Sequence, residues 1–345
     1  MKHGIVSIFG TRPEIIKMAP LIPFLDKAFD HTFIFTSQHY SWNMMSVFFK
    51  ELGVRKPDKY LMVKSSDIRK LEGAIYRELK KSGSEWALVY GDTNSTYAAG
   101  KAAKRLGKKL IHVEAGLRAY DKRLPEERNR REIDKMSDIL FAPTPLTKKQ
   151  LAKEGIRKDV FVVGNLVVDS ARMFSGKKQK RKGGYTLVTM HRQENVDKLR
   201  RLVKILRALS QFPKVIFPIH PRTRKRIRQF GLKIPKNVKL IEPVGYKEFL
   251  SLLKGADLVL TDSGGVQEEA ITLDVPCLTL RESTERWESV EAGGNFIVGL
   301  DPLLVKFYAQ QILEGELGES MKKAKNPYGK DVSKKIIRIL KKKLR

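Results

Sequence analysis

Short apolar runs that alternate with longer helical segments constrain the fold of this chain more than any other feature. Twelve candidate strands lie at residues 4–9, 32–37, 85–90, 109–114, 138–143, 160–165, 185–190, 214–219, 238–243, 257–262, 276–280 and 295–300. The segments between them, such as 96–107 and 198–212, have helical spacing. Continuous apolar character is typical of strands buried on both faces, as in parallel sheets covered by helices. The predicted fold class is therefore α/β.

A chain of 345 residues is longer than a single hydrophobic core usually supports, so two domains are expected. The best boundary is the polar, basic, glycine-bounded stretch at residues 175–184, which leaves about six strands on each side. A final helix over about 331–344 has an apolar stripe and is expected to pack on the first domain. The stripe consists of Val332, Ile336, Ile337, Ile339 and Leu340. The prediction is thus one domain of residues 1–174 plus 331–345 and a second of residues 175–330, each a doubly wound sheet.

Composition narrows the class of protein. The apolar fraction of 41% and the charged fraction of 31% are those of a soluble globular protein, and no window has the roughly eighteen apolar residues of a spanning helix. The N-terminal apolar run is too short for a signal sequence and is interpreted as the first strand. With Cys277 as its single cysteine, the chain has no internal disulfide and no thiolate metal cluster. The cytoplasm is the expected location.

The net charge of +30 raises the question of nucleic-acid binding. The basic residues are spread along the chain and concentrate at 176–184 and at the C-terminus, without zinc-finger spacing, an RNA-binding signature or interleaved aromatics. A solvated lysine-rich surface, as in thermophiles, is the simpler interpretation. Nucleic acid is therefore not expected as a partner.

Charged residues follow the strands of the first half, where open parallel sheets bind their ligands. Arg12 and Lys17 begin a helix after the first strand, although a helix N-terminus disfavours cations unless an anion is bound. Asp92 follows the strand at 85–90 and would either cap a helix or act chemically. Glu114 ends the next strand, and Glu126 begins the helix after it. Together the three acids suggest acid–base chemistry.

The second half repeats the pattern with groups suited to an anion. His191 and His220 follow two strands, each with an arginine nearby. The motif S-G-G-x-x-E-E after the strand at 257–262 would let backbone N–H groups approach a phosphate, with Glu269 far enough along the helix to accept hydrogen bonds from a ribose. Further cations and hydroxyls come from Arg281, Thr284, Glu285 and Arg286. The P-loop, H-E-x-x-H, ordered G-x-G-x-x-G and metal-holding Asp-x-Asp patterns are absent, which disfavours an ATPase, a zinc hydrolase and a nicotinamide dehydrogenase.

Seven motifs, in this order, resemble those of the non-hydrolysing UDP-N-acetylglucosamine 2-epimerases. They are GTRPEIIKMAPL, VYGDTNST, HVEAGLR, LPEERNR, HRQEN, TDSGGVQEEA and STERWESV, and the resemblance runs from about residue 4 to residue 300. It implies two Rossmann-like doubly wound parallel-sheet domains facing a cleft, the glycosyltransferase-B type. Family members are commonly dimers, so a homodimer is expected, together with a UDP-sugar substrate and neither a redox cofactor nor a metal.

The resemblance also implies roles for residues at matching positions. The catalytic positions would be Asp92, Glu114, Glu126 and His191. The substrate-binding positions would be Arg12, Lys17, Phe249, Ser263, Gly264, Gly265, Glu269 and Arg286, with Ser263, Gly264 and Gly265 on the diphosphate and Phe249 beside uracil. Phe249 can equally be a core residue of an amphipathic helix.

The implied reaction interconverts UDP-N-acetylglucosamine and UDP-N-acetylmannosamine through elimination of UDP, a 2-acetamidoglucal and re-addition. Its product would supply surface polysaccharide or glycan synthesis. Three alternatives stay open at this point. One is a hydrolysing epimerase, another an enzyme for a differently decorated UDP-sugar, and the third a glycosyltransferase, which would share the UDP site but lack the set of acids in the first domain.

Overall fold

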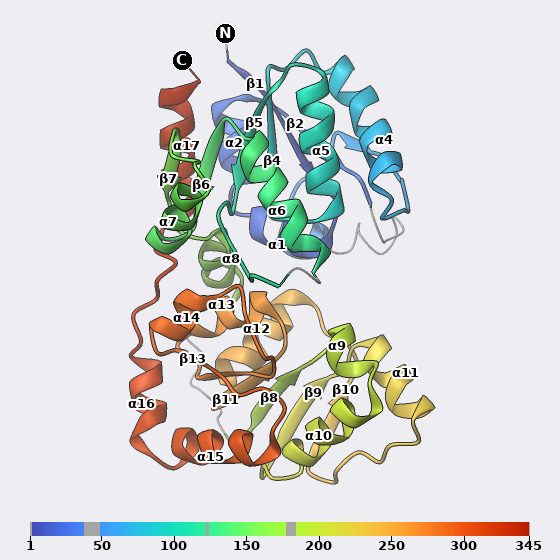
Figure 1. Ribbon diagram of the computed structural model, residues 1–345, viewed down its shortest axis with the longest axis vertical. Coiled ribbons are helices and arrows are strands. Elements are labelled where there is room, and N and C mark those ends of the chain that lie inside the picture. The colour runs from blue at the N-terminus through green and yellow to red at the C-terminus, as the bar shows by residue number, and fades with distance from the viewer. Residues whose placement is uncertain (1, 38–48, 122–123, 177–183, 345) are drawn as a thin grey trace. The chain divides into compact units, whose positions relative to one another are not determined.

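A computed structural model describes residues 2–37, 49–121, 124–176 and 184–344 (Figure 1). The chain divides into two compact units, residues 1–170 with 328–345 and residues 171–327, hereafter unit 1 and unit 2. The sequence-based boundary at 174/175 falls in the stretch at 175–184, of which residues 177–183 lie outside the described residues. Of the helices that the structure describes, none combines the length and apolar character that a membrane crossing requires.

Unit 1 is built on a seven-stranded parallel sheet of order β3-β2-β1-β4-β5-β6-β7. The strands are β1 (Gly4–Phe9), β2 (Asp30–Phe35), β3 (Lys59–Tyr60), β4 (Trp86–Tyr90), β5 (Lys109–Val113), β6 (Ile139–Ala142) and β7 (Val160–Val162). All five residues of β4 are buried, as continuous apolar character predicts for a strand covered on both faces. The six strands predicted in this half are confirmed, with ends that differ by a few residues.

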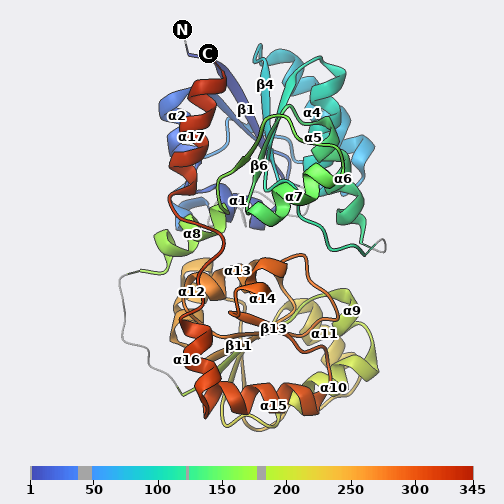
Figure 2. The ribbon, with the colours of Figure 1, turned by 60° about the vertical axis from the view of Figure 1, so that its left-hand side comes forward.

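Helices cover both faces of this sheet. They are α1 (Arg12–Met18), α2 (Ile22–Ala28), α4 (Ile68–Lys81), α5 (Asn94–Arg105), α6 (Pro125–Met136), α7 (Pro145–Lys153) and α17 (Val332–Lys343). Helix α8 (Leu166–Phe174) begins in unit 1 and ends in unit 2. The apolar faces of α4, α5 and α6 share one core with β1, β2, β4 and β5. Helix α17 packs against α2 on the opposite face (Figure 2). Unit 1 is therefore doubly wound.

Unit 2 repeats this architecture on a six-stranded parallel sheet of order β10-β9-β8-β11-β12-β13. Its strands are β8 (Thr186–Thr189), β9 (Val215–Pro218), β10 (Val238–Ile241), β11 (Leu258–Thr261), β12 (Cys277–Thr279) and β13 (Asn295–Ile297). Its helices are α9 (Gln193–Val196), α10 (Leu199–Leu209), α11 (Pro221–Gln229), α12 (Tyr246–Gly255), α13 (Gly264–Thr272), α14 (Trp287–Glu291), α15 (Pro302–Leu313) and α16 (Glu316–Lys322). The six strands predicted here are likewise confirmed.

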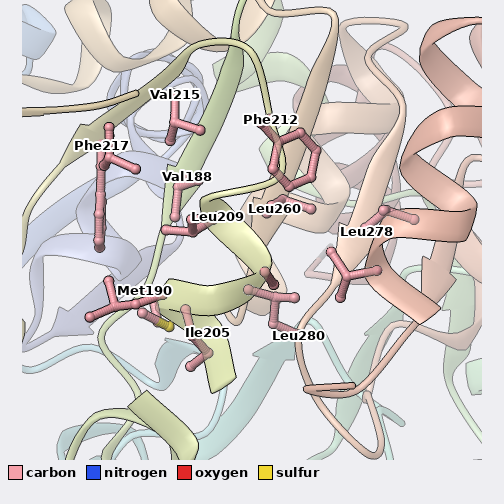
Figure 3. Packing of buried hydrophobic residues seen from close by; sticks show 14 of the residues in the cluster. Val188, Met190, Ile205, Leu209, Phe212, Val215, Phe217, Leu260, Leu278 and Leu280 are labelled. Atoms are coloured by element: carbon pink, nitrogen blue, oxygen red, sulfur yellow. The ribbon is translucent and has the colours of Figure 1, made fainter. Parts of the chain in front are cut away.

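The main core of unit 2 joins α10 and α15 to the sheet. Figure 3 shows Ile205 and Leu209 of α10 among strand residues such as Val188, Phe217 and Leu260. All of these side chains are almost fully buried. Both helices therefore lie on the same face of the sheet and turn their remaining sides outward.

Candidate functional site

The connection from β1 to α1 is held by the buried Glu14 carboxylate. Its Oε2 accepts hydrogen bonds from the backbone N–H groups of Gly10 (3.0 Å) and Thr11 (2.7 Å) and from Thr11 Oγ1 (2.8 Å). Its Oε1 accepts from the hydroxyls of Thr93 and Thr96, both at 2.8 Å. Burial raises the pKa of Glu14, and these hydrogen bonds oppose that rise. Glu14 thus ties the loop after β1 to the loop after β4.

Gly10 is required where the chain leaves β1. A Cβ there would lie 2.1 Å from Ser95 Oγ and 2.4 Å from Thr36 Oγ1, closer than any side chain permits. Arg12 then takes the first position of α1 and is half-buried, whereas Lys17, in the last turn, is buried. The two cationic side chains of α1 therefore lie in different environments.

Glu114 follows β5 and is buried with a positive φ of 74°, which a non-glycine residue adopts at an energetic cost. Its Oε2 lies 2.8 Å from Lys17 Nζ, accepts a hydrogen bond from Asn165 Nδ2 (3.1 Å) and accepts another from the Tyr90 hydroxyl. The carboxylate thus has one buried cation and two neutral donors as partners. A cation and hydrogen-bond donors favour the charged form of a carboxylate, whereas burial opposes it.

Asp92 does not cap α5. Thr93 does so instead, since its hydroxyl accepts the Thr96 N–H at 3.2 Å. The Asp92 Oδ2 accepts hydrogen bonds from Arg130 Nε (3.1 Å) and Arg130 Nη2, and its side chain is 24% exposed. Asp92 is therefore an oriented carboxylate that still reaches solvent.

The two glutamates that begin α6 have different environments. Glu127 is buried, accepts the Ala119 N–H at 2.9 Å and pairs with Arg130 Nη1 at 2.9 Å. Glu126 is exposed and has no hydrogen-bond or ion-pair partner among the described residues. Glu127 is thus a structural group, whereas Glu126 has the accessible carboxylate.

In unit 2, the buried Asp262 carboxylate organises the residues around His191. It accepts the backbone N–H groups of His191 (3.2 Å) and Arg192 (3.0 Å) and the side-chain amide of Asn195 (3.2 Å). The His191 ring is 47% exposed, with Nδ1 3.7 Å from Asp262 Oδ1 and its centroid 5.7 Å from that of His220. Burial, followed by the nearby His191 and Arg222, lowers the pKa of His220.

The start of α13 is crowded at one glycine and open at the next. A Cβ at Gly264 would lie 2.4 Å from Glu285 Oε1, whereas one at Gly265 would have no neighbour closer than Ser263 Oγ at 4.0 Å. Glu285 is itself held by Arg281 at 2.9 Å. Gly264 thus has no room for a side chain, whereas the space beside the Gly265 Cα is open at the N-terminus of α13, the end of a helix that favours anions.

The adjacent glutamates of α13 are both buried and both paired. Glu268 Oε1 lies 3.0 Å from Nε of the buried Arg286. Glu269 Oε1 accepts a hydrogen bond of 2.9 Å from the Tyr246 hydroxyl, whose pKa is raised well above its usual value by burial and by Glu269. Phe249, on α12, is half-buried.

The predicted residues gather at the point in each sheet where the strand order reverses. In unit 1 this point lies between β1 and β4, the strands that precede Arg12 and Asp92, with Glu114 after the neighbouring β5. In unit 2 it lies between β8 and β11, the strands that precede His191 and Ser263. Open parallel sheets bind ligands at such switch points, so both groups occupy the position where chemistry is expected.

Four partners of these residues were not predicted from the sequence: Tyr90, Arg130, Asn165 and Asp262. Arg130 and Asp262 lie within the LPEERNR and TDSGGVQEEA motifs, so a closer reading of the motifs could have included them. Tyr90 likewise lies within the VYGDTNST motif, whereas Asn165 lies in none of the seven motifs and reaches Glu114 from a separate part of the chain.

A surface hollow and a metal-binding cluster are two other kinds of candidate site. A hollow of about 500 Å³ in unit 2 is lined by residues of α11 and the 242–243 segment and contains none of the predicted site residues. No three His, Cys, Asp or Glu side chains are grouped as metal ligands in the part of the chain that the structure describes.

The topology defines a protein of two Rossmann-like parallel-sheet domains, and the predicted fold class is confirmed. A profile of the UDP-N-acetylglucosamine 2-epimerase family matches residues 25–341. The UDP-N-acetylglucosamine 2-epimerase of Methanococcus maripaludis is 42% identical over 97% of both chains. The crystal structure of the Methanocaldococcus jannaschii UDP-GlcNAc 2-epimerase in complex with UDP-GlcNAc and UDP superposes with a TM-score of 0.87 at 41% identity, covering 98% of this chain and 99% of the other.

The chain belongs to the UDP-N-acetylglucosamine 2-epimerase family of isomerases. One relative carries a different name: the UDP-2,3-diacetamido-2,3-dideoxy-D-glucuronate 2-epimerase of Pseudomonas aeruginosa, 39% identical over 86% of this chain and 88% of that protein.

Proposed function

We propose that this protein is a non-hydrolysing epimerase that interconverts UDP-N-acetylglucosamine and UDP-N-acetylmannosamine at sugar C2. The observation that carries the proposal is the pair of oriented carboxylates, Asp92 and Glu114, that follow neighbouring strands at the switch point of unit 1. Membership of the family supports the choice of substrate, because the similar Methanocaldococcus jannaschii structure contains UDP-GlcNAc and UDP.

The proposed reaction balances without a redox step. A carboxylate removes the C2 proton, the C–H electron pair forms the C1–C2 double bond, and the C1–O bond breaks with its electrons on the β-phosphate oxygen of UDP. The 2-acetamidoglucal is then protonated at C2 on the opposite face as a UDP oxygen adds back to C1. Because a C2–H is a weak acid, the departing diphosphate needs stabilisation by cations and N–H donors.

The acid–base roles are proposed for Asp92, Glu114 and Glu126 of unit 1 as a set. Arg130 would orient Asp92, and the contact of Lys17 with Glu114 would hold that carboxylate in its charged form. Glu126 is the exposed member of the set and would be the easiest to reprotonate from solvent. Lys17 would therefore have two proposed roles, to bind phosphate and to position the Glu114 carboxylate.

The UDP-binding roles are proposed mainly for unit 2. Ser263, Gly264 and Gly265, at the N-terminus of α13, would bind the diphosphate through their backbone N–H groups. Glu269 would accept the ribose hydroxyls. The remaining proposed ligands are His191 for the departing phosphate, Phe249 for uracil, and Arg286 with Arg12 for the phosphates.

A second candidate substrate follows from the relative in Pseudomonas aeruginosa. At 39% identity, that relative is nearly as similar as the Methanococcus maripaludis UDP-N-acetylglucosamine 2-epimerase, which is 42% identical. The same elimination and re-addition would then act on a UDP-sugar with a second acetamido group and a carboxylate. In either case, the proposed biological role is the supply of an epimerised amino sugar for surface polysaccharide or glycan synthesis.

Proton NMR of UDP-N-acetylglucosamine in deuterated water tests the proposal. Formation of UDP-N-acetylmannosamine with deuterium at C2 and no free sugar is expected. Free N-acetylmannosamine with UDP would instead assign a hydrolysing epimerase. An unchanged spectrum with this substrate, but turnover of the diacetamido glucuronate, would assign the second candidate.

Carboxamide variants test the assigned residues in the same assay. Glu114→Gln and Asp92→Asn are expected to lower kcat about 10²–10⁴-fold, the range for loss of general acid–base catalysis. Glu132→Gln on α6 is the matched control, since that carboxylate is exposed and pairs only with Lys135 at 3.2 Å among the described residues. If either site variant kept the activity of the control, its assigned role would be wrong.

A further inference from the structure

Helix α15 exposes an apolar ridge. Leu303 is 77% exposed, Phe307 57% and Leu304 41%, although the helix already buries a separate stripe in the core of unit 2. That stripe consists of Val305, Ala309 and Ile312. The exposed ridge is thus not part of the core that α15 forms with the sheet. Large apolar side chains clustered on a surface usually mark an interaction site.

Helix α10 places cations beside this ridge. Figures 1 and 2 show the two helices side by side, and Gln211, just after α10, donates a hydrogen bond of 3.2 Å to the carbonyl of the first residue of α15. Arg200, Lys204 and Arg207 of α10 and Lys306 of α15 are all exposed. Among the described residues, none of these four cations has an ion-pair or hydrogen-bond partner for its side chain. Their charges are therefore available to an external anion.

The sequence around α10 is rich in cations, although several of them pair with acids from outside this stretch. These pairs are Arg201 with Glu282, Arg222 and Arg226 with Asp197, and Arg224 with Glu242. Between residues 198 and 241 the chain has 14 lysines and arginines and neither an aspartate nor a glutamate. The acids nearest in sequence to the α15 ridge are Asp301, which caps the helix through the Leu303 N–H, and Glu314 at its other end. The surface formed by α10 and α15, hereafter the α10–α15 surface, thus combines exposed apolar side chains with a net positive charge.

We propose that the α10–α15 surface binds the headgroup region of an anionic lipid bilayer. Leu303, Leu304 and Phe307 would enter the boundary between headgroups and acyl chains, and the cations of α10 and Lys306 would contact the phosphates. A helix with an apolar face beside lysines and arginines is the arrangement of peripheral, non-spanning membrane proteins. The protein would then be a peripheral membrane protein, independently of its proposed enzymatic function.

Other occupants fit this surface less well. A symmetric contact with a second copy would bring the same unpaired cations toward one another, which is unfavourable. A nucleic acid would contact the cations with its phosphates and the ring of Phe307 with a base, but the two exposed leucines would have no comparable partner. An anionic bilayer offers partners to both, acyl chains to the apolar side chains and phosphates to the cations.

Co-sedimentation of the full chain with vesicles tests the proposal. The protein is expected to bind vesicles of phosphatidylcholine with phosphatidylglycerol and not vesicles of phosphatidylcholine alone. Leu303→Gln/Phe307→Gln is expected to weaken binding about tenfold or more. Arg200→Glu/Lys204→Glu/Arg207→Glu is expected to weaken it at least about a hundredfold, because each lost cation costs about fivefold and the added glutamates are repelled by the anionic lipids.

Matched controls come from other surfaces. Met173→Gln changes an apolar side chain on α8 that is 58% exposed, and Lys341→Glu/Lys342→Glu reverses exposed charges on α17. Both controls should bind vesicles as the wild type does, and all variants should keep the circular dichroism spectrum and the UDP-sugar turnover of the wild type.

Three results would overturn the proposal. The first is equal binding by the control and ridge variants. The second is binding to DNA that matches or exceeds vesicle binding and is insensitive to the Leu303/Phe307 change. The third is dissociation of a wild-type dimer into monomers by that change, measured by light scattering, which would assign the ridge to a second copy.

Discussion

At the scale of single residues, the contact between Lys17 and Glu114 joins two groups that are 97 positions apart in sequence and both almost completely buried. An opposite charge at 2.8 Å favours the ionised carboxylate, whereas burial alone would disfavour it. If Glu114 acts as a base, loss of this contact should change the pH dependence of the reaction.

Lys17→Met tests that consequence, because methionine keeps the length of the side chain and removes its charge. The acid limb of the pH profile of kcat/KM is expected to move upward by about one unit, since the carboxylate loses the cation that favours its ionised form. Lys101→Met is the matched control, because Lys101 pairs with the carboxylate of Glu72, which has no proposed part in the reaction. An acid limb at the wild-type position would show that Lys17 does not act through Glu114.

Cys277 gives a second prediction at this scale. The thiol is fully buried in β12, and burial raises its pKa to about 12, so the reactive thiolate is almost absent near neutral pH. A chromogenic disulfide reagent should therefore detect no thiol in the native protein and one thiol per chain after unfolding in denaturant. Rapid reaction of the native protein would contradict this.

At the scale of helices and strands, apolar patterning identified nearly all of the sheet framework. The strands are recognisable because both faces are buried and their residues are continuously apolar, as in the five buried residues of β4. Strand β3 was not predicted, because two residues, Lys59 and Tyr60, are too short a run to show any period. Its place at the sheet edge depends on pairing with β2, which is a tertiary contact.

The candidate site was predictable in position and less so in its contacts. A residue directly after a parallel strand must lie at the carboxyl edge of the sheet, so Asp92 and Glu114 could be identified from the strand pattern alone. Their partners could not, because Arg130 is 38 positions from Asp92 and Asn165 is 51 from Glu114. Sequence position determines where a strand ends, but only the folded chain determines which side chains meet there.

Helix α17 shows how one element is fixed by another. The carboxylate of Asp169, on α8, accepts the first backbone N–H groups of α17, those of Val332 (3.2 Å) and Ser333 (2.8 Å), and also the Ser333 hydroxyl (2.8 Å). It therefore serves as an N-cap supplied from a distant part of the chain.

Asp169→Ala should weaken α17 by about 0.5–2 kcal/mol, the usual cost of losing a cap. Hydrogen exchange of α17 amides is expected to speed up while exchange in α13 stays the same. Lys334→Ala, which breaks only an exposed contact with Asp331, is the control. Unchanged α17 exchange in the Asp169 variant would mean that packing alone fixes the helix.

At the scale of the whole molecule, the end of the chain returns from unit 2 to complete unit 1. Six apolar side chains of the final segment are buried: Tyr328, Val332, Ile336, Ile337, Leu340 and Leu344. The carbonyl of Tyr328 accepts the backbone N–H of Asn165 at 2.9 Å, and the Asn165 side chain donates to Glu114. The C-terminal segment is thus connected to the candidate catalytic carboxylate through a single residue.

Removal of residues 328–345 should therefore affect unit 1 selectively. Each buried side chain contributes at most about 1.5–3 kcal/mol, so the loss amounts to several kcal/mol of unit 1 stability. Amide exchange in α2 and α8 is expected to accelerate while α10 and α13 keep their protection, and turnover should fall because Asn165 loses a fixed position. Leu340→Asp in the full-length chain should produce the same pattern, since it forces a charge into the same contact.

Equal loss of protection in both units would instead mean that they unfold as one cooperative structure, and unchanged turnover would mean that the segment stabilises unit 1 without holding Glu114.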